Sequence, residues 1–235
     1  MYMRNLLIIL LLLVNAGCSS QKIVRVGSTS VVIKHIKKGN GKNFVHLHQN
    51  EKTALQAARR VVQTEGGSVL TLVHPGARNI VFYLDSNRYE FDPNRIFTDV
   101  GIKKTLKQFG PYSPKAHNEV KKLAEQIKGA LPPGKIIAVH NNHDYSIKKY
   151  FPGNELQHDA KELTFDPQSF FRNFYLVTQN YDFTRLKKLG FNAVLQAPSA
   201  VDDGSLSVYL THRDYVNVEA GYGQLIAQIH MLKVA

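Results

Sequence analysis

The sequence predicts a single α/β domain with a mostly parallel or mixed central sheet flanked by helices. Short apolar and β-branched runs alternate along the chain with longer stretches whose apolar residues recur every three or four positions. This alternation is typical of sheets that helices cover. The chain has 235 residues, which is long enough to bury one core but short for two domains, and it contains no internal repeat.

The N-terminal half is expected to supply the first strands and the first helix. Strands are predicted at residues 28–36, 44–47, 68–73 and 79–84. The lysine- and glycine-rich turn at residues 37–42 predicts that the first two strands form a hairpin at one edge of the sheet. Helical spacing predicts a helix over residues 51–64, which Gly66 and Gly67 end. Residues 86–99 are polar and lack periodicity, so we expect an ordered loop there.

The C-terminal half continues this alternation. Helices are expected at residues 103–109, 114–131, 183–189 and 221–234, and strands at residues 135–139, 174–178, 192–196, 206–210 and 215–218. Residues 141–168 are polar and irregular, which suits the rim of a site. In such sheets ligands bind beyond the carboxyl ends of the strands. Polar side chains that follow the strands are therefore the functional candidates.

The N-terminus has the features of an export signal. Arg4 precedes an apolar run over residues 6–14, which is too short to span a membrane as a helix. The run ends in Asn15-Ala16-Gly17-Cys18, which resembles the lipobox of bacterial lipoproteins, where cleavage before the cysteine leaves a lipidated N-terminus. The expected organisation is a signal peptide at residues 1–17, a tether at residues 18–28 and a folded catalytic domain at residues 29–235.

Charge and cysteine content restrict the partners. Cys18 is the only cysteine, so the chain can form no internal disulfide, and its position favours lipid attachment over catalysis. The expected location is the bacterial cell envelope, on its periplasmic or extracellular face. Plain secretion stays open because Asn15 stands where lipoboxes carry an aliphatic residue. A net charge of +12 favours anionic lipids, cell-wall polymers or acidic substrates. We expect no nucleic acid and no obligate protein partner.

A histidine and a glutamate stand three residues apart where the strand at residues 44–47 meets the next helix. His48 follows the strand and Glu51 begins the helix. On a strand-to-helix turn this spacing lets both side chains bind one face of a divalent metal. His46 lies on the same strand face as His48 but deeper in the strand, so we leave it out of the site.

A third metal ligand is expected from another strand end, because catalytic zinc commonly takes three protein ligands and keeps one position for water. His140 follows the apolar residues 136–139 and is the best candidate. His143 is the rival, and a supporting or surface role suits it better. The predicted site therefore holds one zinc ion through His48, Glu51 and His140.

Two arginines lie seven residues apart in the expected loop at residues 86–99. Arg95 beside Asn94 suits bidentate capture of a substrate carboxylate. Arg88 can face a carbonyl oxygen that gains negative charge during a reaction. The structural alternative is an ion pair between Arg88 and Asp92 that ties the loop.

The last candidate is Glu219, where the apolar strand at residues 215–218 meets a glycine-containing turn. A carboxylate beside an activated water can act as general base and then protonate a leaving amine. The structural alternative is a carboxylate that stabilises the N-terminus of a helix.

Taken in order, these motifs resemble the zinc carboxypeptidase superfamily, and most closely its succinylglutamate desuccinylase and aspartoacylase branch. His48-Gln49-Asn50-Glu51 is similar to the His-x-Asn-Glu motif of that branch. Asp92-Pro93-Asn94-Arg95-Ile96-Phe97, with Arg88 before it, is similar to its Asp-x-Asn-Arg-x-Phe motif. His140 and Glu219 then match a strand-end histidine and a late strand-end glutamate. The resemblance covers residues 44–235.

The resemblance implies a zinc carboxypeptidase-like fold and a role for each residue. It implies zinc on His48, Glu51 and His140, carbonyl polarisation by Arg88, carboxylate binding by Asn94 and Arg95, and Glu219 as base. Two positions depart from the family pattern. Gln49 replaces a usual glycine and is expected to narrow the pocket, and Val139 stands where an aspartate usually precedes the histidine. Tyr209, Tyr215 and Tyr222 compete for the place of a tyrosine that lines the pocket in many carboxypeptidases.

These features predict a zinc-dependent hydrolase that cleaves an amide bond next to a free carboxylate. The first substrate class is peptides, including peptidoglycan stem peptides, which a metallocarboxypeptidase trims; the envelope location favours it. The alternative is an N-acyl amino acid, deacylated as in the closer family branch. A non-catalytic envelope lipoprotein that binds zinc or peptide is the third hypothesis.

Overall fold

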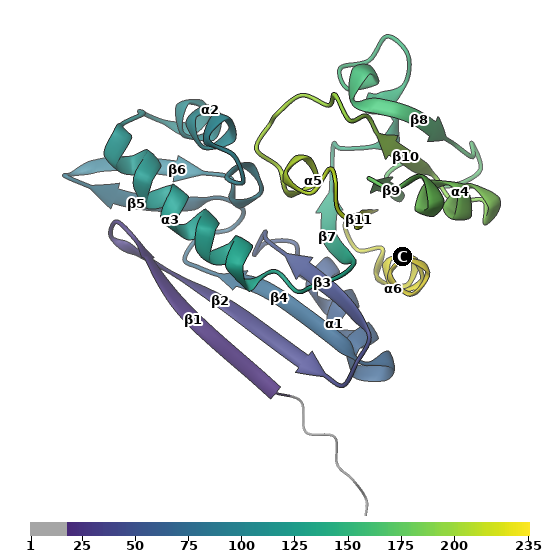
Figure 1. Cartoon of the computed structure of the whole chain (residues 1–235), viewed down its shortest axis with the longest axis horizontal. Helices are drawn as coiled ribbons and strands as arrows, with labels where there is room; N and C mark the ends of the chain where they lie inside the picture. The colour runs from purple at the N-terminus through teal and green to yellow at the C-terminus, as the bar shows by residue number, and fades with distance from the viewer. Residues whose placement is uncertain (1–17) are drawn as a thin grey trace, which may run out of the picture.

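A nine-stranded mixed sheet runs through the molecule (Figure 1). The computed structural model describes residues 18–235. The strands lie in the order β1, β2, β4, β3, β7, β11, β9, β10, β8. Their bounds are Cys18–Val26 (β1), Thr29–Lys38 (β2), Lys42–His46 (β3), Gly67–Val73 (β4), Ile136–Asn142 (β7), Ala160–Thr164 (β8), Phe174–Val177 (β9), Ala193–Gln196 (β10) and Tyr215–Gly221 (β11). The central strands β4, β3, β7 and β11 are parallel, and antiparallel pairs flank them, so the predicted mixed α/β sheet is confirmed.

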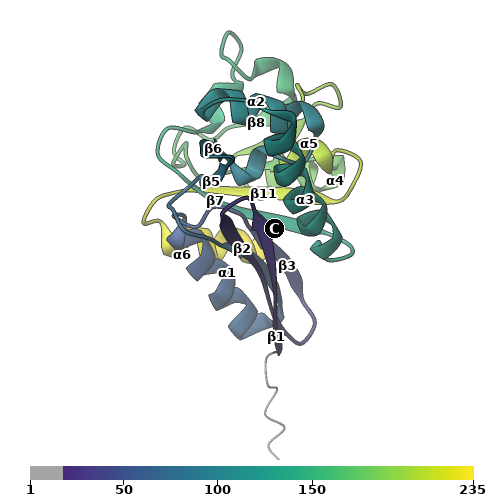
Figure 2. The same ribbon diagram turned by 90° about the vertical axis from the view of Figure 1, so that its left-hand side faces the viewer.

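Helices cover both faces of this sheet, and each face has its own apolar core. One core contains α1 (Lys52–Glu65), α4 (Asn180–Lys188) and α6 (Leu225–Val234). The other contains α2 (Asp99–Phe109), α3 (Pro114–Ala130), α5 (Leu206–Tyr209) and the small sheet of β5 (Ile80–Leu84) and β6 (Asn87–Phe91). Figure 2 shows α1 and α6 on one side of the sheet and α3 on the other.

Alternation along the central strands divides side chains between the two cores. On β7, Ile136 and Ala138 belong to the core that contains α3, whereas Ile137 and Val139 belong to the core that contains α1. Successive strand residues point to opposite faces, so His140 continues the α3 face beyond Ala138. This face therefore changes from apolar to polar at the carboxyl ends of the parallel strands, where the candidate site lies.

Helix α1 ends at two glycines, as predicted. Gly66 and Gly67 have φ angles of +81° and +114°, which L-residues with a side chain rarely adopt. A Cβ at Gly67 would lie 2.2 Å from the carbonyl oxygen of Lys42. The missing side chain is what lets β4 begin directly beside β3.

The predicted tether at residues 18–28 is wrong. Residues 18–26 form β1, which pairs with β2 from Cys18↔Lys37 to Val26↔Thr29. The edge hairpin is therefore β1–β2, and β2 pairs next with β4 rather than with β3. The first six residues of β1 are exposed, so this edge strand lacks the apolar alternation that reveals a half-buried strand.

Other local expectations also change. The expected loop at residues 86–99 contains β6 and the short 3-10 helix η1 (Pro93–Arg95). The expected strand at residues 206–210 is α5, which Ser205 begins by accepting a hydrogen bond from the Val208 N–H. Residues 141–168 contain the end of β7, the 3-10 helices η2 (Ile147–Tyr150) and η3 (Gln157–Asp159), and β8. The closing helix starts at Leu225 because β11 extends through Gly221.

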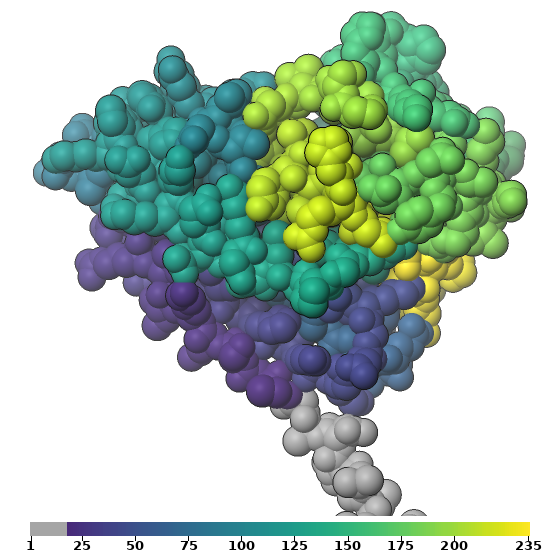
Figure 3. Space-filling model, viewed as in Figure 1, coloured from purple at the N-terminus to yellow at the C-terminus, as the bar shows by residue number. Residues whose placement is uncertain are grey.

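The chain around α5 lies between an earlier and a later part of the chain. In Figure 3 it lies between the teal segment that contains α2 and α3 and the green segment that contains β8 and α4. The backbone N–H of Phe97 donates to the Gly204 carbonyl at 2.9 Å, which fixes this contact.

The predicted signal peptide at residues 1–17 lies outside the described residues. Cys18 is exposed at the first position of β1. Within residues 18–235, none of the helices has the length and apolar character that crossing a bilayer requires.

Candidate metal centre

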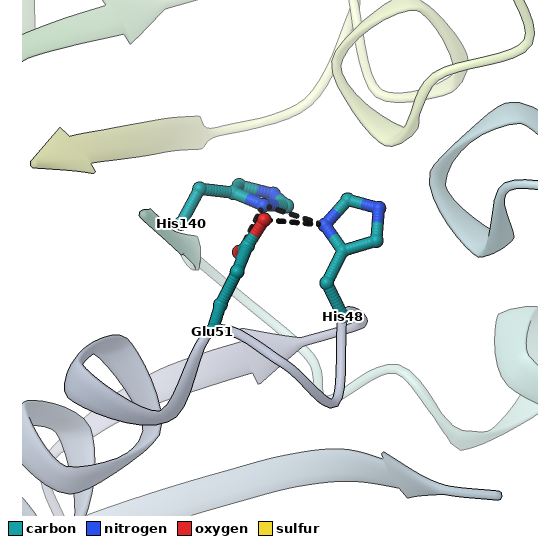
Figure 4. A group of neighbouring side chains, drawn as sticks. All are labelled: His48, Glu51 and His140. Carbon is teal, nitrogen blue, oxygen red and sulfur yellow. Dashed lines mark hydrogen bonds and ion pairs between the residues drawn. The ribbon is translucent and has the colours of Figure 1, made fainter. Parts of the chain in front are cut away.

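Three side chains that can bind a metal, His48, Glu51 and His140, meet at the carboxyl edge of the sheet (Figure 4). His48 lies two residues past β3, Glu51 directly before α1, and His140 within β7. Glu51 Oε1 is 2.9 Å from His48 Nδ1, Glu51 Oε2 is 3.0 Å from His140 Nδ1, and the two Nδ1 atoms are 3.2 Å apart. Across residues 18–235, this is the one group of three or more His, Cys, Asp or Glu side chains close enough to share an ion.

The geometry of this group fits a divalent metal. His48, Glu51 and His140 are 1%, 1% and 3% exposed, and one ligand atom from each lies within 4.8 Å of the others. Ligands 2.0–2.2 Å from one ion are themselves roughly 3–4 Å apart, close to the observed separations. Two imidazole nitrogens and one carboxylate oxygen are a donor set that zinc takes in catalytic sites.

Asp92 follows β6 and orients His48. Its Oδ1 lies 2.7 Å from His48 Nε2, so in the neutral ring the proton sits on Nε2 and the Nδ1 lone pair faces Glu51 and His140. A carboxylate behind a metal-binding histidine fixes the tautomer in this way. Burial alone lowers the pKa of His48, but the Glu51 and Asp92 carboxylates outweigh it and raise that pKa to about 9. Despite its own burial, Asp92 has a pKa below its usual range, because His48 lies beside it.

Arg78 is a candidate that the sequence analysis did not identify. It lies in the turn between β4 and β5, and its guanidinium is 2.7 Å from Glu51 Oε1 and 3.4 Å from Asp92 Oδ2. About half of its side chain is exposed, and it lines the same cavity as His48 and Glu51. The sequence signal was its position in a turn beyond the carboxyl end of an apolar strand.

Arg88 does not lie at this site, which corrects the predicted placement. It is an exposed residue of β6, paired with Glu90 rather than with Asp92, and it is not part of the cavity wall. The reason is that the expected loop forms a strand paired with β5. That strand ends at Phe91, and it is the next residue, Asp92, that enters the site.

Asn94 and Arg95 line the cavity, and both have protein partners. Asn94 Oδ1 accepts a hydrogen bond from the Leu206 N–H at 3.0 Å, which ties η1 to α5. Arg95 donates to the Asn94 carbonyl at 2.8 Å and lies 3.5 Å from Asp203 Oδ2. The second contact is long for a hydrogen bond, so the guanidinium can turn toward an anion in the cavity.

Glu219 lies in β11, in register with His140 on the neighbouring strand β7. Its carboxylate is buried and lines the same cavity as the metal-binding group. Asn142 Nδ2 donates to Oε2 at 3.0 Å, and Asn217 Nδ2 donates to Oε1 at 3.1 Å. Glu219 is therefore a residue of the sheet itself and does not stabilise the N-terminus of α6.

One cavity of about 460 Å³ contains these groups. This volume is within the usual range for small-molecule sites. Its further walls come from the segment after β7, with Tyr145, Lys149 and Tyr150, and from the segment before α5, with Asp203 and Ser205. The cavity can therefore accept a small polar molecule beside the metal-binding group and Glu219.

The remaining sequence candidates are His143 and three tyrosines. His143 is not part of the metal-binding group; it stacks on Tyr222 with ring centroids 4.1 Å apart, and both line the cavity. The Tyr222 hydroxyl accepts a hydrogen bond from Asn50 Nδ2 at 2.9 Å. Tyr215 also lines the cavity, whereas Tyr209 does not.

Gln49 does not narrow the cavity. Its Oε1 accepts a hydrogen bond from the backbone N–H of His74 at 2.6 Å, and it is absent from the cavity wall. Gln49 therefore connects the turn after β3 to the turn after β4.

Comparisons with known proteins give a distant structural match. No family model and no curated protein matches the sequence. Among solved structures, the fold is similar to an aspartoacylase family protein from Mesorhizobium loti, with 13% sequence identity and a TM-score of 0.42. The match covers 93% of this chain and 65% of that protein, so the chain spans about two thirds of its length.

Proposed function

We propose that the chain is a zinc-dependent hydrolase that cleaves an amide bond next to a free carboxylate. The observation that carries the proposal is the buried group of His48, Glu51 and His140, which shares one cavity with Glu219. A metal-binding group and a carboxylate base in one small cavity are the two parts that metal-assisted hydrolysis requires.

A divalent metal held by His48, Glu51 and His140 would acidify a water molecule and polarise the scissile carbonyl. Glu219 takes a proton from the attacking water and then delivers it to the leaving nitrogen. Arg78, whose guanidinium contacts Glu51, donates to the carbonyl oxygen as it gains charge. Arg95 binds the free carboxylate of the substrate.

Two substrate classes suit this arrangement, because each places one residue with a free carboxylate in the cavity. The first is an N-acyl amino acid, which releases an acyl acid; the cavity of about 460 Å³ has room for such a molecule. The second is a peptide such as a peptidoglycan stem peptide, and the predicted export signal supports it. Purified zinc-loaded protein should be assayed against N-acetylaspartate, N-succinylglutamate and stem peptides, with released acyl acid and released D-alanine or diaminopimelate measured separately.

The metal site has its own test. Zinc content should be close to one ion per chain in the parent and should fall strongly in His48→Ala. No zinc in the parent, or equal zinc in both proteins, would refute the site. Glu219→Gln should retain zinc and lose about 100-fold or more in kcat with little change in KM. Full activity in that variant would remove Glu219 as the base.

A non-catalytic protein that binds zinc or peptide through this cavity is the competing hypothesis. It predicts zinc in the parent and in Glu219→Gln, but turnover in neither. The hydrolase hypothesis requires turnover of at least one substrate of the panel by the parent.

We further propose that Cys18 carries lipid and anchors the domain to the bacterial envelope. Because β1 begins at Cys18, a lipid there would hold the edge of the sheet next to the membrane. Metabolic labelling with a fatty acid should mark the parent and not Cys18→Ser. Equal labelling, or none in the parent, would refute the anchor.

A further inference from the structure

Two asparagines hold the carboxylate of Glu219, one on each oxygen. Asn142 Nδ2 donates to Oε2 at 3.0 Å and Asn217 Nδ2 donates to Oε1 at 3.1 Å. Asn142, Asn217 and Glu219 are 6%, 7% and 6% exposed, and all three line the cavity.

The sheet itself brings these side chains together. Asn217 lies two residues before Glu219 and therefore on the same face of β11. Asn142 lies two residues after His140 on β7, and the strand register pairs Glu219 with His140. Asn142 Nδ2 also donates to the Arg172 carbonyl at 3.1 Å, which fixes its amide plane. The carboxylate is thus held by two parallel central strands, which position side chains more accurately than loops do.

The chemistry of the contact determines which amide atom faces Glu219. An ionised carboxylate only accepts hydrogen bonds, so the nitrogen of each amide must point at it. Two donors, one on each oxygen, fix the rotation of the carboxylate plane. Each oxygen keeps further acceptor capacity, so the group can still receive a proton from water.

The two asparagines also differ from a purely structural buried asparagine. Among the described residues, neither Asn142 Oδ1 nor Asn217 Oδ1 has a hydrogen-bond partner, although both atoms are buried. A buried acceptor without a protein partner is costly unless a bound molecule satisfies it. Asn192 shows the contrast: it is 2% exposed, its Oδ1 accepts from the Asp166 N–H at 2.8 Å, and its Nδ2 donates to the Asn173 carbonyl at 3.3 Å.

We propose that Asn142 and Asn217 are positioning residues that hold the Glu219 carboxylate in the orientation needed for proton transfer. The inference rests on the proposed role of Glu219 as the base. Misplacing a reacting group by about 1 Å can lower a rate on the order of 100-fold. Losing either donor should therefore affect the chemical step and leave metal and substrate binding intact.

The first test uses Asn142→Leu and Asn217→Leu, which remove the donor at similar side-chain volume. In the zinc-loaded protein, with whichever panel substrate the parent hydrolyses, each should lower kcat about 10- to 100-fold. KM and zinc content should not change. Asn142→Asp and Asn217→Asp keep the shape of the side chain but lose its N–H groups, so they should lower kcat at least as strongly. They replace a leucine variant in this test if that variant does not fold. Asn192→Leu is the matched control and should lower Tm without lowering kcat.

A double-mutant cycle separates positioning from general destabilisation. If the asparagines act through Glu219, their substitution in a Glu219→Gln background should cause no further loss of the residual rate. Independent, additive losses would overturn the inference, as would unchanged kcat in both single variants. An inactive Glu219→Gln with fully active asparagine variants rejects this inference alone. A fully active Glu219→Gln, or a parent without turnover, rejects the proposed function as well.

Discussion

At the scale of single residues, the site consists of charges that fix one another's orientation. Glu51 contacts His48, His140 and Arg78, and Asp92 contacts His48 and Arg78. Buried charges depend on their partners, because removal of one leaves the other unpaired. Substitutions here should therefore disturb the orientation of the remaining side chains and, with it, metal binding.

Asp92→Asn should lower the affinity for zinc about 10- to 100-fold. A neutral amide supports the His48 ring less well than a carboxylate does, so Nδ1 becomes a weaker ligand. Competition with a chelator of known affinity measures the change. Asp99→Asn, at an exposed carboxylate paired with Lys121, is the control and should bind zinc like the parent.

Arg78 and Arg88 offer a matched pair for testing the corrected assignment. Arg78→Ala should lower kcat/KM on the order of 100-fold, because it removes a donor to the developing negative charge. Arg88→Ala should leave kcat/KM unchanged, since Arg88 pairs with Glu90 outside the cavity. A loss of kcat/KM in Arg88→Ala and none in Arg78→Ala would assign carbonyl polarisation to Arg88.

At the scale of elements, polar residues reach the site because the central strands are parallel and end together. β3, β7 and β11 deliver His48, His140 and Glu219 to one edge, which the sequence analysis expected from three apolar runs followed by polar residues. The predictions at β1, β6 and α5 are wrong. These elements are exposed, short or fixed by long-range contacts, so their local patterns carry little information.

The close approach of β3 and β4 gives a stability prediction. Gly67→Ala should destabilise the protein by about 1–3 kcal/mol, because its φ is +114° and the new Cβ would lie 2.2 Å from the Lys42 carbonyl oxygen. Gly129→Ala is the control: it lies in α3 with no atom within 4 Å of the added Cβ, and stability should stay level or rise slightly. Denaturant unfolding measures both, and equal effects would contradict the argument.

At the scale of the whole molecule, the net charge does not describe the cavity. The chain carries +12, yet the cavity wall contains six carboxylates, from Asp and Glu, against three Arg and Lys side chains. The basic residues that suggested acidic partners are therefore mostly on the outer surface. A divalent metal would offset part of the negative charge inside.

Zinc binding should therefore stabilise the whole fold. Free zinc at 100 times its Kd adds about 2.7 kcal/mol to the unfolding free energy, which corresponds to a rise in Tm of roughly 5–10 °C for a domain of this size. Thermal unfolding with zinc and with excess chelator measures the difference. His48→Ala should show no such difference, and a zinc effect of equal size in that variant would place the ion elsewhere.

The sequence alone determined the α/β class, the central strands and the His48, Glu51, His140 and Glu219 candidates, because these depend on local apolar patterns and on polar residues that follow them. Only the tertiary structure decided which arginine faces the metal-binding group, that Asp92 supports His48, and that Asn142 and Asn217 hold Glu219. The two residues of each contact lie far apart in the sequence in most cases: the separations are 44, 27, 14, 77 and 2 positions. Most of these separations exceed the range over which helix or strand periodicity acts, so strand order and register had to bring the groups together.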